Sequence, residues 1–419
     1  MTSVLLKDVQ LDGETTHVYV SGNRIEEIGK KREADTVLEC KGKVALPGMV
    51  NLHTHAAMAL FRGFADDVRL QDWLERKIWP QEAKMTPDDV YWGTKLACLE
   101  MIKTGTTTFN DMYFHMDHAA KAVKEMGLRG FLAEGFIDLG IASRAKEQFK
   151  QVDEVNRKIE GMKLERITPV LGPHAIYTVS EDSWRRFGDL ADKKGYMTHT
   201  HLSETKREVE ECAARYGARP ATYLEKLGIL ARSTIVAHGC WLDPSEIELL
   251  ARSGTKVAHC PVSNLKLAAG QVMPFPALHE AGVVMGLGTD GPASNNSLDM
   301  FETMKVAALI QKFAHNDPTV LPAKEAFELA SLGGARALGI DAGLVEAGRL
   351  ADILVVDPKR AELTPRHDDL SNWVYSAHGN VVDTVICDGQ VLMKGRRVKG
   401  EGEILEKAAA VARDLVTRE

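Results

Sequence analysis

The chain has 419 residues, of which 44% are hydrophobic and 26% are charged, a composition typical of soluble globular proteins. This length is too great for one small core and suits a large barrel with a minor domain. The 52 basic and 59 acidic residues give a net charge of −7. That charge argues against nucleic acid as a partner, because a nucleic-acid-binding face should be basic.

The N-terminal sequence becomes charged too early to be a signal peptide, and no apolar stretch approaches the length of a membrane span. The six cysteines are scattered and form no Cys-x-x-Cys pair, which is typical of proteins in a reducing compartment. We therefore expect a cytoplasmic protein without a membrane partner.

Both ends of the chain are rich in short β-like runs. The N-terminal runs are residues 4–9, 17–29 and 37–47, and the C-terminal runs are residues 348–357 and 382–395, with a hairpin turn at 387–390. Residues 403–418 predict a surface helix. Two β-rich ends around an α/β middle predict one small β-sandwich domain, formed by residues 1–46 together with 346–419.

Between residues 47 and 345 short apolar runs alternate with helical patterns. The eight runs are residues 48–55, 106–112, 129–135, 167–174, 196–202, 234–239, 256–260 and 283–290. The helical patterns include residues 86–103, 117–127, 180–194, 219–227 and 244–253. This alternation predicts an α/β fold in which residues 47–345 form a (β/α)8 TIM barrel, the catalytic domain. The long link over residues 56–105 is expected to shape a substrate pocket.

Histidines and acidic residues follow the ends of most of these runs. They are His53, His55, His174, His199, His201, Glu204, His238, His259 and Asp290. His53 and His55 lie two positions apart on one strand, so their side chains point to the same side. Active sites of such barrels lie at the carboxyl ends of the strands. Packing alone explains this set poorly, because barrel walls favour branched aliphatic residues and buried histidines need hydrogen-bond partners.

Several imidazoles and one carboxylate suit a divalent cation that keeps one position open for water and lowers the pKa of that water. A site for two metals usually has a bridging group, often a modified lysine at the end of the fourth run, where His174 stands instead. We therefore predict one divalent ion per subunit. Zn²⁺ is the first expectation, and Fe²⁺, Ni²⁺ and Mn²⁺ are alternatives that accept similar ligands.

The ordered set of motifs resembles the amidohydrolase superfamily over nearly the whole chain. The motifs are PGMVNLHTH at 47–55, THTHLSE at 198–204, VAHG at 236–239, GTDGPASNNSLDM at 288–300 and GRLADILVVD at 348–357. The likeness is greatest to the methylthioadenosine/S-adenosylhomocysteine deaminases, including the 5'-deoxyadenosine deaminases. Residues 72–74 and 79–82 are similar to the substrate loop of that group.

The resemblance implies that the metal ligands are His53, His55, His201 and Asp290. His199 then takes a supporting or structural position. The resemblance also implies that Glu204 protonates the ring nitrogen, and that Asp290 transfers the proton of the attacking water to the leaving ammonia. His238 is implied as a hydrogen-bond partner of the attacking hydroxide.

Four further residues are implied as substrate contacts. Glu82 would accept hydrogen bonds from the ribose hydroxyls, and His174 would contact the sugar or the base. Trp73 would pack against the base or the 5' substituent, although it also suits a core position. Arg144, placed in a loop, would bind a substrate carboxylate, and a plain surface arginine is the alternative. His259 and Ser294 are expected to line the pocket without an assigned role.

The predicted function is hydrolytic deamination of an adenine nucleoside to the inosine analogue and ammonia, in the salvage of S-adenosylmethionine by-products. The predicted substrates are 5'-deoxyadenosine, 5'-methylthioadenosine, S-adenosylhomocysteine and adenosine. The alternatives are a guanine deaminase or triazine hydrolase of the same superfamily, and a metal-free scaffold, which should have a broken ligand set. The small zinc deaminases are excluded, because Cys260-Pro261 has no second cysteine nearby. Relatives are often dimers or tetramers, so a homo-oligomer is expected.

Overall fold

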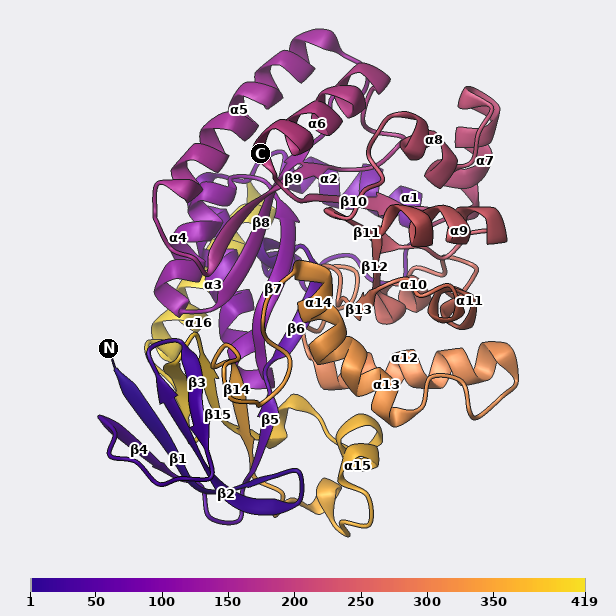
Figure 1. The fold of residues 1–419 in the computed structure, drawn as a ribbon. Coiled ribbons are helices and arrows are strands. Elements are labelled where there is room, and N and C mark those ends of the chain that lie inside the picture. Colours follow the sequence, from indigo (N-terminus) through magenta and orange to yellow (C-terminus); the bar gives the residue numbers. More distant parts are fainter. Residues whose placement is uncertain (1, 419) are drawn as a thin grey trace.

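The computed structural model describes residues 2–418. Its centre is a parallel sheet of eight strands arranged in chain order and rolled into a nearly closed barrel (Figure 1). The strands are β6 (Met49–Thr54), β7 (Thr106–Tyr113), β8 (Arg129–Phe136), β9 (Ile167–Pro173), β10 (Thr198–Leu202), β11 (Thr234–His238), β12 (Lys256–His259) and β13 (Met285–Leu287). The predicted (β/α)8 barrel is confirmed, and each strand coincides with one of the eight apolar runs.

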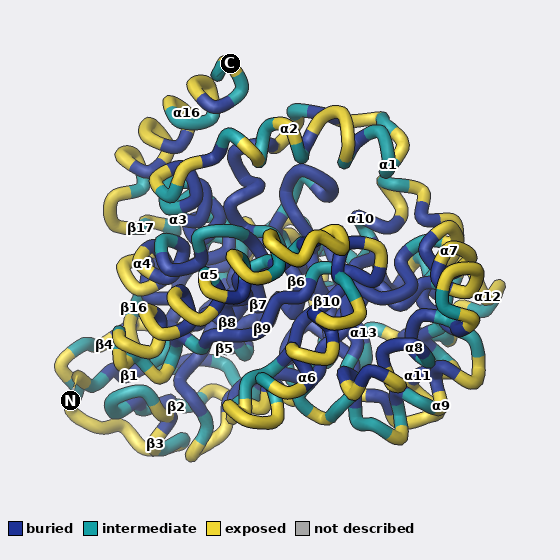
Figure 2. The backbone as a smooth tube through the Cα atoms, turned by 90° about the horizontal axis from the view of Figure 1, so that it is seen from above, coloured by how far each residue is buried: buried dark blue, intermediate teal, exposed yellow. Residues whose placement is uncertain are grey.

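Helices surround the barrel. They are α3 (Pro87–Thr104), α4 (Met116–Met126), α5 (Ala142–Glu160), α6 (Glu181–Lys194), α7 (Lys206–Tyr216), α8 (Pro220–Lys226), α9 (Pro244–Ser253), α10 (Pro261–Lys266), α11 (Phe275–Glu280), α12 (Met300–His315), α13 (Ala323–Glu328) and α14 (Gly334–Leu338). Figure 2 shows the barrel strands buried, while helices such as α5 and α7 alternate buried and exposed positions. That alternation is typical of amphipathic helices that pack one apolar face against the barrel.

Helix α5 contradicts one prediction. Arg144 was placed in a loop, but it lies in the first turn of α5, where it is exposed. Ile141 precedes the helix without a side-chain cap, so the usual sequence signal for a helix start is missing. The buried Phe149, Val152 and Val155 hold α5 against its neighbours instead.

The barrel closes between its last strand and its first. Here the main chain after β13 meets β6: the Asp290 amide donates to the His53 carbonyl at 3.0 Å, and the Thr289 amide donates to Asn51 Oδ1 at 3.0 Å. Gly288 permits this approach, because a Cβ there would lie 2.9 Å from the Cβ of His53. The seam therefore joins residues that the sequence analysis had singled out at both ends of the barrel.

Both termini contribute to a second sheet of nine strands, as predicted. Its strands are β1 (Ser3–Leu11), β2 (Glu14–Ser21), β3 (Arg24–Ile28), β4 (Thr36–Glu39), β5 (Val44–Pro47), β14 (Ile353–Val356), β15 (Val382–Cys387), β16 (Gln390–Lys394) and β17 (Arg397–Val398). Leu6 and Val20 from one end of the chain share a buried core with Ile353 and Ile386 from the other. The sheet is followed by α16 (Glu401–Thr417), which packs on α3.

Two ion pairs of the buried Arg129 side chain join the two sheets. Arg129, at the start of β8, lies 3.3 Å from Asp352 and 3.0 Å from Asp388, next to strands β14 and β15. Such a pair is expensive to break because removal of one partner leaves a buried charge. The chain passes from the terminal sheet to the barrel between β5 and β6. No helix within residues 2–418 has both the length and the apolar character that crossing a membrane requires.

The long link after β6 folds into short helical turns. They are η1 (Ala56–Phe61), α1 (Leu70–Trp73), η2 (Leu74–Ile78) and α2 (Trp79–Glu82). Several of their side chains line the main pocket at the carboxyl end of the barrel, which agrees with the expectation that this link shapes a pocket.

Candidate active site

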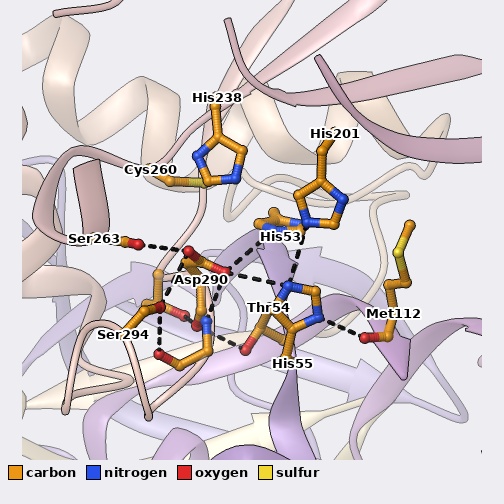
Figure 3. Close-up of polar contacts among 12 residues, drawn as sticks. His53, Thr54, His55, Met112, His201, His238, Cys260, Ser263, Asp290 and Ser294 are labelled. Carbon is orange, nitrogen blue, oxygen red and sulfur yellow. Dashed lines mark hydrogen bonds and ion pairs between the residues drawn. The ribbon is translucent and has the colours of Figure 1, made fainter. Parts of the chain in front are cut away.

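Five side chains of metal-ligand type meet at the carboxyl end of the barrel (Figure 3). They are His53, His55, His201, His238 and Asp290. Asp290 Oδ1 lies 3.3 Å from Nε2 of His53 and 3.3 Å from Nε2 of His55. Nε2 of His201 lies 3.3 Å from Nε2 of His55. The four residues that the resemblance implied as ligands thus come together, with His238 beside them.

Hydrogen bonds on the outer side of the rings fix the tautomers of two of these histidines. His55 Nδ1 donates to the Met112 carbonyl at 2.6 Å, and His201 Nδ1 donates to the His174 carbonyl at 2.8 Å. A carbonyl oxygen can only accept, so each Nδ1 carries the proton and each Nε2 keeps a lone pair. Both lone pairs therefore face the centre of the site.

His53 is held in the same way through His199. His53 Nδ1 lies 2.7 Å from His199 Nε2, and His199 Nδ1 lies 3.3 Å from the Ile235 carbonyl. Because the carbonyl accepts the proton of His199 Nδ1, His199 Nε2 is left as the acceptor for His53 Nδ1. The Nε2 lone pair of His53 then also points to the centre.

A divalent cation fits this arrangement. Nε2 of His53 is buried and has no hydrogen-bond partner among residues 2–418. The Nε2 lone pairs of His55 and His201 face each other at 3.3 Å and repel unless a positive charge lies between them. Burial lowers the pKa of His53 to about 4, so the ring is neutral and able to act as a ligand at neutral pH. The donor set of imidazoles and one carboxylate suits a borderline metal ion.

Asp290 is oriented by three donors. Ser263 Oγ and Ser294 Oγ donate to its Oδ2 at 2.5 and 3.1 Å, and the Gly291 amide donates to Oδ1 at 2.8 Å. Its backbone has φ 62°, a region that few residues other than glycine adopt. Burial alone would raise the pKa of Asp290, but the neighbouring histidines, His53 first, hold it well below its ordinary value. Asp290 is therefore a carboxylate at neutral pH.

Glu204 and His238 face each other beside this cluster. His238 Nε2 lies 3.9 Å from Glu204 Oε2, and His238 Nδ1 donates to Asn264 Oδ1 at 2.8 Å. Burial raises the pKa of Glu204, which favours the protonated acid. Burial alone would lower the pKa of His238, but the carboxylates of Glu204 and Asp290 outweigh it and raise that pKa. The protonation states of Glu204 and His238 are therefore coupled.

The cluster lies in a pocket that contains about 710 Å³ of space, including the part open to solvent. Its lining includes His55, Trp73, Trp79, Glu82, Tyr113, His174, Tyr177, His201, Glu204, His238, Asp290 and Ser294. We call His53, His55, His201 and Asp290 the pocket floor, and Glu82, Tyr113 and Glu204 the pocket wall. The pocket combines apolar surface with a few polar groups, as small-molecule sites do.

Glu82, the last residue of α2, accepts a hydrogen bond from the Tyr113 hydroxyl at 2.7 Å. Desolvation in the pocket raises the pKa of Glu82 to about 7 in spite of that bond. His174 also lines the pocket. Its Nδ1 lies 2.9 Å from Thr178 Oγ1, and burial lowers its pKa to about 3. A neutral imidazole and a titratable carboxyl group are therefore available to a ligand above the floor.

The remaining predicted contacts lie in different places. Trp73 is buried, as a core position predicts, and it also lines the pocket; its contact with a substrate stays a prediction. Arg144 lines an adjacent pocket that shares Glu82 with the main one, and its contact with a substrate stays a prediction. Ser294 lines the main pocket, as expected. His259 is absent from that lining and borders a separate pocket with Asn264.

Three residues of the site were not predicted from the sequence. Ser263 and Asn264 hold Asp290 and His238, and Tyr113 holds Glu82. The signal for the first two was a polar Ser-Asn pair that is separated from the seventh predicted strand by two residues. Nothing in the local sequence of β7 distinguishes Tyr113 from a core aromatic residue.

Similar proteins cover nearly the whole chain. The profile of the Amidohydrolase family matches residues 44–392. A 5'-deoxyadenosine deaminase of Methanoregula boonei is 49% identical over 98% of this chain and 92% of its own length. A 5-methylthioadenosine/S-adenosylhomocysteine deaminase of Thermococcus onnurineus is 48% identical over 91% of this chain and 90% of its own. The crystal structure of an adenosine deaminase from Xanthomonas campestris with bound zinc has a TM-score of 0.94 and 35% identity, with 99% of both chains covered.

Proposed function

The chain belongs to the amidohydrolase family, as the resemblance predicted, and from this premise we propose that it is a metal-dependent deaminase of adenine nucleosides. Water replaces the amino group at C6, and the products are the inosine analogue and ammonia. The observation that carries the proposal is the meeting of neutral imidazoles, the Asp290 carboxylate and the buried acid Glu204 in one pocket. The relatives named as 5'-deoxyadenosine and methylthioadenosine/S-adenosylhomocysteine deaminases support this choice of substrate.

We propose His53, His55, His201 and Asp290 as the residues that hold one divalent ion, with zinc as its identity. The zinc in the Xanthomonas campestris relative supports zinc here. When bound, such an ion lowers the pKa of water and so supplies hydroxide at neutral pH. His199 supports the set by holding the tautomer of His53.

The chain's own acids and bases then move the protons. Glu204, whose pKa is raised by burial, donates a proton to N1 of the purine ring, which makes C6 more open to attack. Asp290 accepts the proton of the attacking water and passes it to the leaving ammonia. His238, whose Nδ1 donates to Asn264, is proposed to donate a hydrogen bond to the attacking oxygen from a protonated Nε2, that is, as the imidazolium. Each of these roles needs the side chain at the pocket floor or close to it.

The other end of the pocket is proposed to hold the sugar. As a carboxylate, Glu82 accepts hydrogen bonds from the two ribose hydroxyls, and Tyr113 fixes its orientation. His174 contacts the sugar or the base, and Trp73 packs against the base or the 5' substituent. Arg144 in the adjacent pocket is proposed to meet a 5' substituent that carries a carboxylate.

Other reactions of the family would use the same pocket floor, so the residues of the pocket wall must decide which substrate binds. A guanine deaminase or a triazine hydrolase acts on a ring without ribose, and such a ring offers Glu82 no pair of hydroxyls to hold. A metal-free scaffold should lack part of the ligand set, whereas the whole set is present in this chain.

The test is an ammonia-release screen with the purified, zinc-loaded protein. The substrates are 5'-deoxyadenosine, 5'-methylthioadenosine, S-adenosylhomocysteine, adenosine, guanine and cytosine. We expect release from the nucleosides and not from guanine or cytosine. Release from guanine alone would overturn the proposal in favour of the free-base reaction. The zinc content per chain, measured in parallel, should be close to one.

A homo-oligomer is proposed on the likeness to the deaminases, and light scattering coupled to size-exclusion chromatography checks it. A dimer or tetramer is expected at micromolar protein concentration. A monomer at every concentration would contradict this part of the proposal.

A further inference from the structure

A buried glutamate lies directly behind the proposed acid, Glu204. Thr205-Lys-Arg-Glu208 has the spacing of a capping box at the start of α7, and Thr205 Oγ1 does accept from the Glu208 amide at 3.2 Å. In a capping box the glutamate side chain returns to the amide of the capping residue itself. Here it reaches further: Oε1 of Glu208 accepts from the Ser203 amide at 2.9 Å, and Oε2 accepts from the Glu204 amide at 2.8 Å.

Glu208 thus holds the main chain at Ser203 and Glu204 through two hydrogen bonds. The side chain of Glu204 has no hydrogen-bond partner within residues 2–418, and its nearest oppositely charged group is His238 at 3.9 Å. The direction of that side chain therefore depends on its backbone. Ser203, just before it, has φ 50°, and its only other main-chain anchor among the described residues is the Trp241 amide, which donates to the Ser203 carbonyl at 2.9 Å.

We propose that Glu208 is a positioning residue for the deamination reaction, which holds the backbone of Ser203 and Glu204 so that the acid points at the purine ring. This inference rests on the proposed function, because it gives Glu204 the transfer of a proton to N1. Proton transfer needs the donor within hydrogen-bond reach of its acceptor, so a small rotation of this turn removes the acid from the reaction without emptying the pocket.

The molecule contains a matched control. Glu134, near the end of β8, is buried like Glu208 and also accepts from two consecutive amides, those of His115 at 3.2 Å and Met116 at 2.8 Å. It accepts one further hydrogen bond, from Gln151 Nε2 at 2.6 Å. Burial raises the pKa of both glutamates to about 7. The turn that Glu134 holds begins α4 and carries no proposed reacting group. Loss of either glutamate should lower the stability of the fold to a similar extent. Only loss of Glu208 should lower the rate of deamination.

The first experiment compares Glu208→Gln with Glu134→Gln. In each variant an acceptor oxygen becomes an NH₂ group that faces a backbone N–H, so one hydrogen bond turns into a contact between two donors. We expect Glu208→Gln to lower kcat for 5'-deoxyadenosine by about 10- to 100-fold, with full zinc content and KM within about threefold of the wild type. Glu134→Gln should lower the melting temperature similarly and keep kcat within about threefold.

The second experiment is a double-mutant cycle with Glu204→Gln. A residue that acts only through Glu204 has little left to affect once that acid is gone, so Glu208→Gln should lower kcat by less than about threefold in the Glu204→Gln background. A purely structural role would give the same loss in both backgrounds. If Glu208→Gln does not fold, the cycle is run with Glu208→Asp, which keeps the charge and shortens the reach.

The outcomes separate the two proposals. Full kcat in folded Glu208→Gln, an equal loss in Glu134→Gln, or multiplicative losses in the double variant would overturn the positioning role alone. A wild-type protein that releases no ammonia from any adenine nucleoside would overturn the proposed function, and this inference with it.

Discussion

At the floor of the pocket, Asp290 receives hydrogen bonds from two serines and a main-chain amide and lies among imidazoles. Along the wall, Glu82 has the Tyr113 hydroxyl as a hydrogen-bond donor, and Glu204 lies 3.9 Å from His238. The pKa of Asp290 is held well below the ordinary value, whereas the pKa values of Glu82 and Glu204 are raised. All three are carboxyl groups in the same pocket.

The difference shows that the supply of hydrogen-bond donors from neighbouring groups, rather than burial by itself, decides the protonation state of a carboxyl group. Burial pushes all three groups toward the neutral acid, and only at the floor do the neighbours reverse that push. A permanent anion suits a cation site. A carboxyl group with a raised pKa suits acid catalysis. The contrast therefore favours ion binding for Asp290 on the pocket floor and proton transfer or substrate binding for the carboxyl groups of the pocket wall.

Removal of the floor anion should have the largest effect. Asp290→Asn keeps the size of the side chain and removes its charge, so we expect loss of zinc together with a fall in kcat of at least about 10⁴-fold. Zinc content and ammonia release measure the two losses. Asp368→Asn is the control, since Asp368 caps the short helix α15 (Asp369–Tyr375) in the terminal region. Normal zinc content and activity in Asp290→Asn would contradict the ligand role.

Removal of the wall acid should separate chemistry from metal binding. Glu204→Gln cannot give a proton to the ring, so kcat should fall by about 10²- to 10⁴-fold while zinc content stays at the wild-type value. Ammonia release and metal analysis on the same sample check this. Full activity in this variant would refute the acid role, and loss of zinc would make Glu204 part of the floor.

The second wall carboxylate should affect binding more than turnover. Glu82→Ala removes the acceptor for the ribose hydroxyls, so KM for nucleosides should rise by about 10- to 100-fold, the value of one or two charge-assisted hydrogen bonds. The affinity for free adenine as an inhibitor should change little. Equal effects on the nucleoside and the base would remove the argument that Glu82 holds ribose.

The smallest effect should appear in the pH dependence of binding. Below its pKa of about 7, Glu82 is protonated and loses acceptor capacity, so KM for 5'-deoxyadenosine should fall by a few-fold as the pH rises through about 7. In Glu82→Gln this dependence should disappear. The raised pKa also means that the folded chain binds more protons here than the unfolded chain between pH 4.5 and about 7, so the contribution of Glu82 to stability decreases as the pH rises through that window.

Much of the barrel could be predicted because its signals are local. Each strand is a short apolar run, and the proposed ligands lie at or just after the ends of these runs, as His53 on β6 and His55 after it do. The alternation of a strand places both rings on one side, so a sequence is enough to propose half of the site. Helix α5 was missed because its first residue has no capping neighbour.

The supporting contacts could not be predicted, because they join segments far apart in the chain. Asn264 and Ser263, both in helix α10, contact His238 and Asp290, which lie at two other strand ends of the barrel. The hydrogen bonds of Glu208 to the Ser203 and Glu204 amides could not be predicted for another reason. Its spacing from Thr205 indicates an ordinary capping box, and the displacement toward Ser203 and Glu204 depends on the left-handed backbone at Ser203.

The seam between β6 and β13 has a consequence for the way this protein matures. Thr54 and Asp290 are 236 positions apart, so the two sides of the metal site emerge from the ribosome at very different times. The affinity for the divalent ion should stay weak until β13 docks against β6, because the Asp290 carboxylate is missing from the site until then. Uptake of metal during refolding should therefore report the final step of barrel assembly.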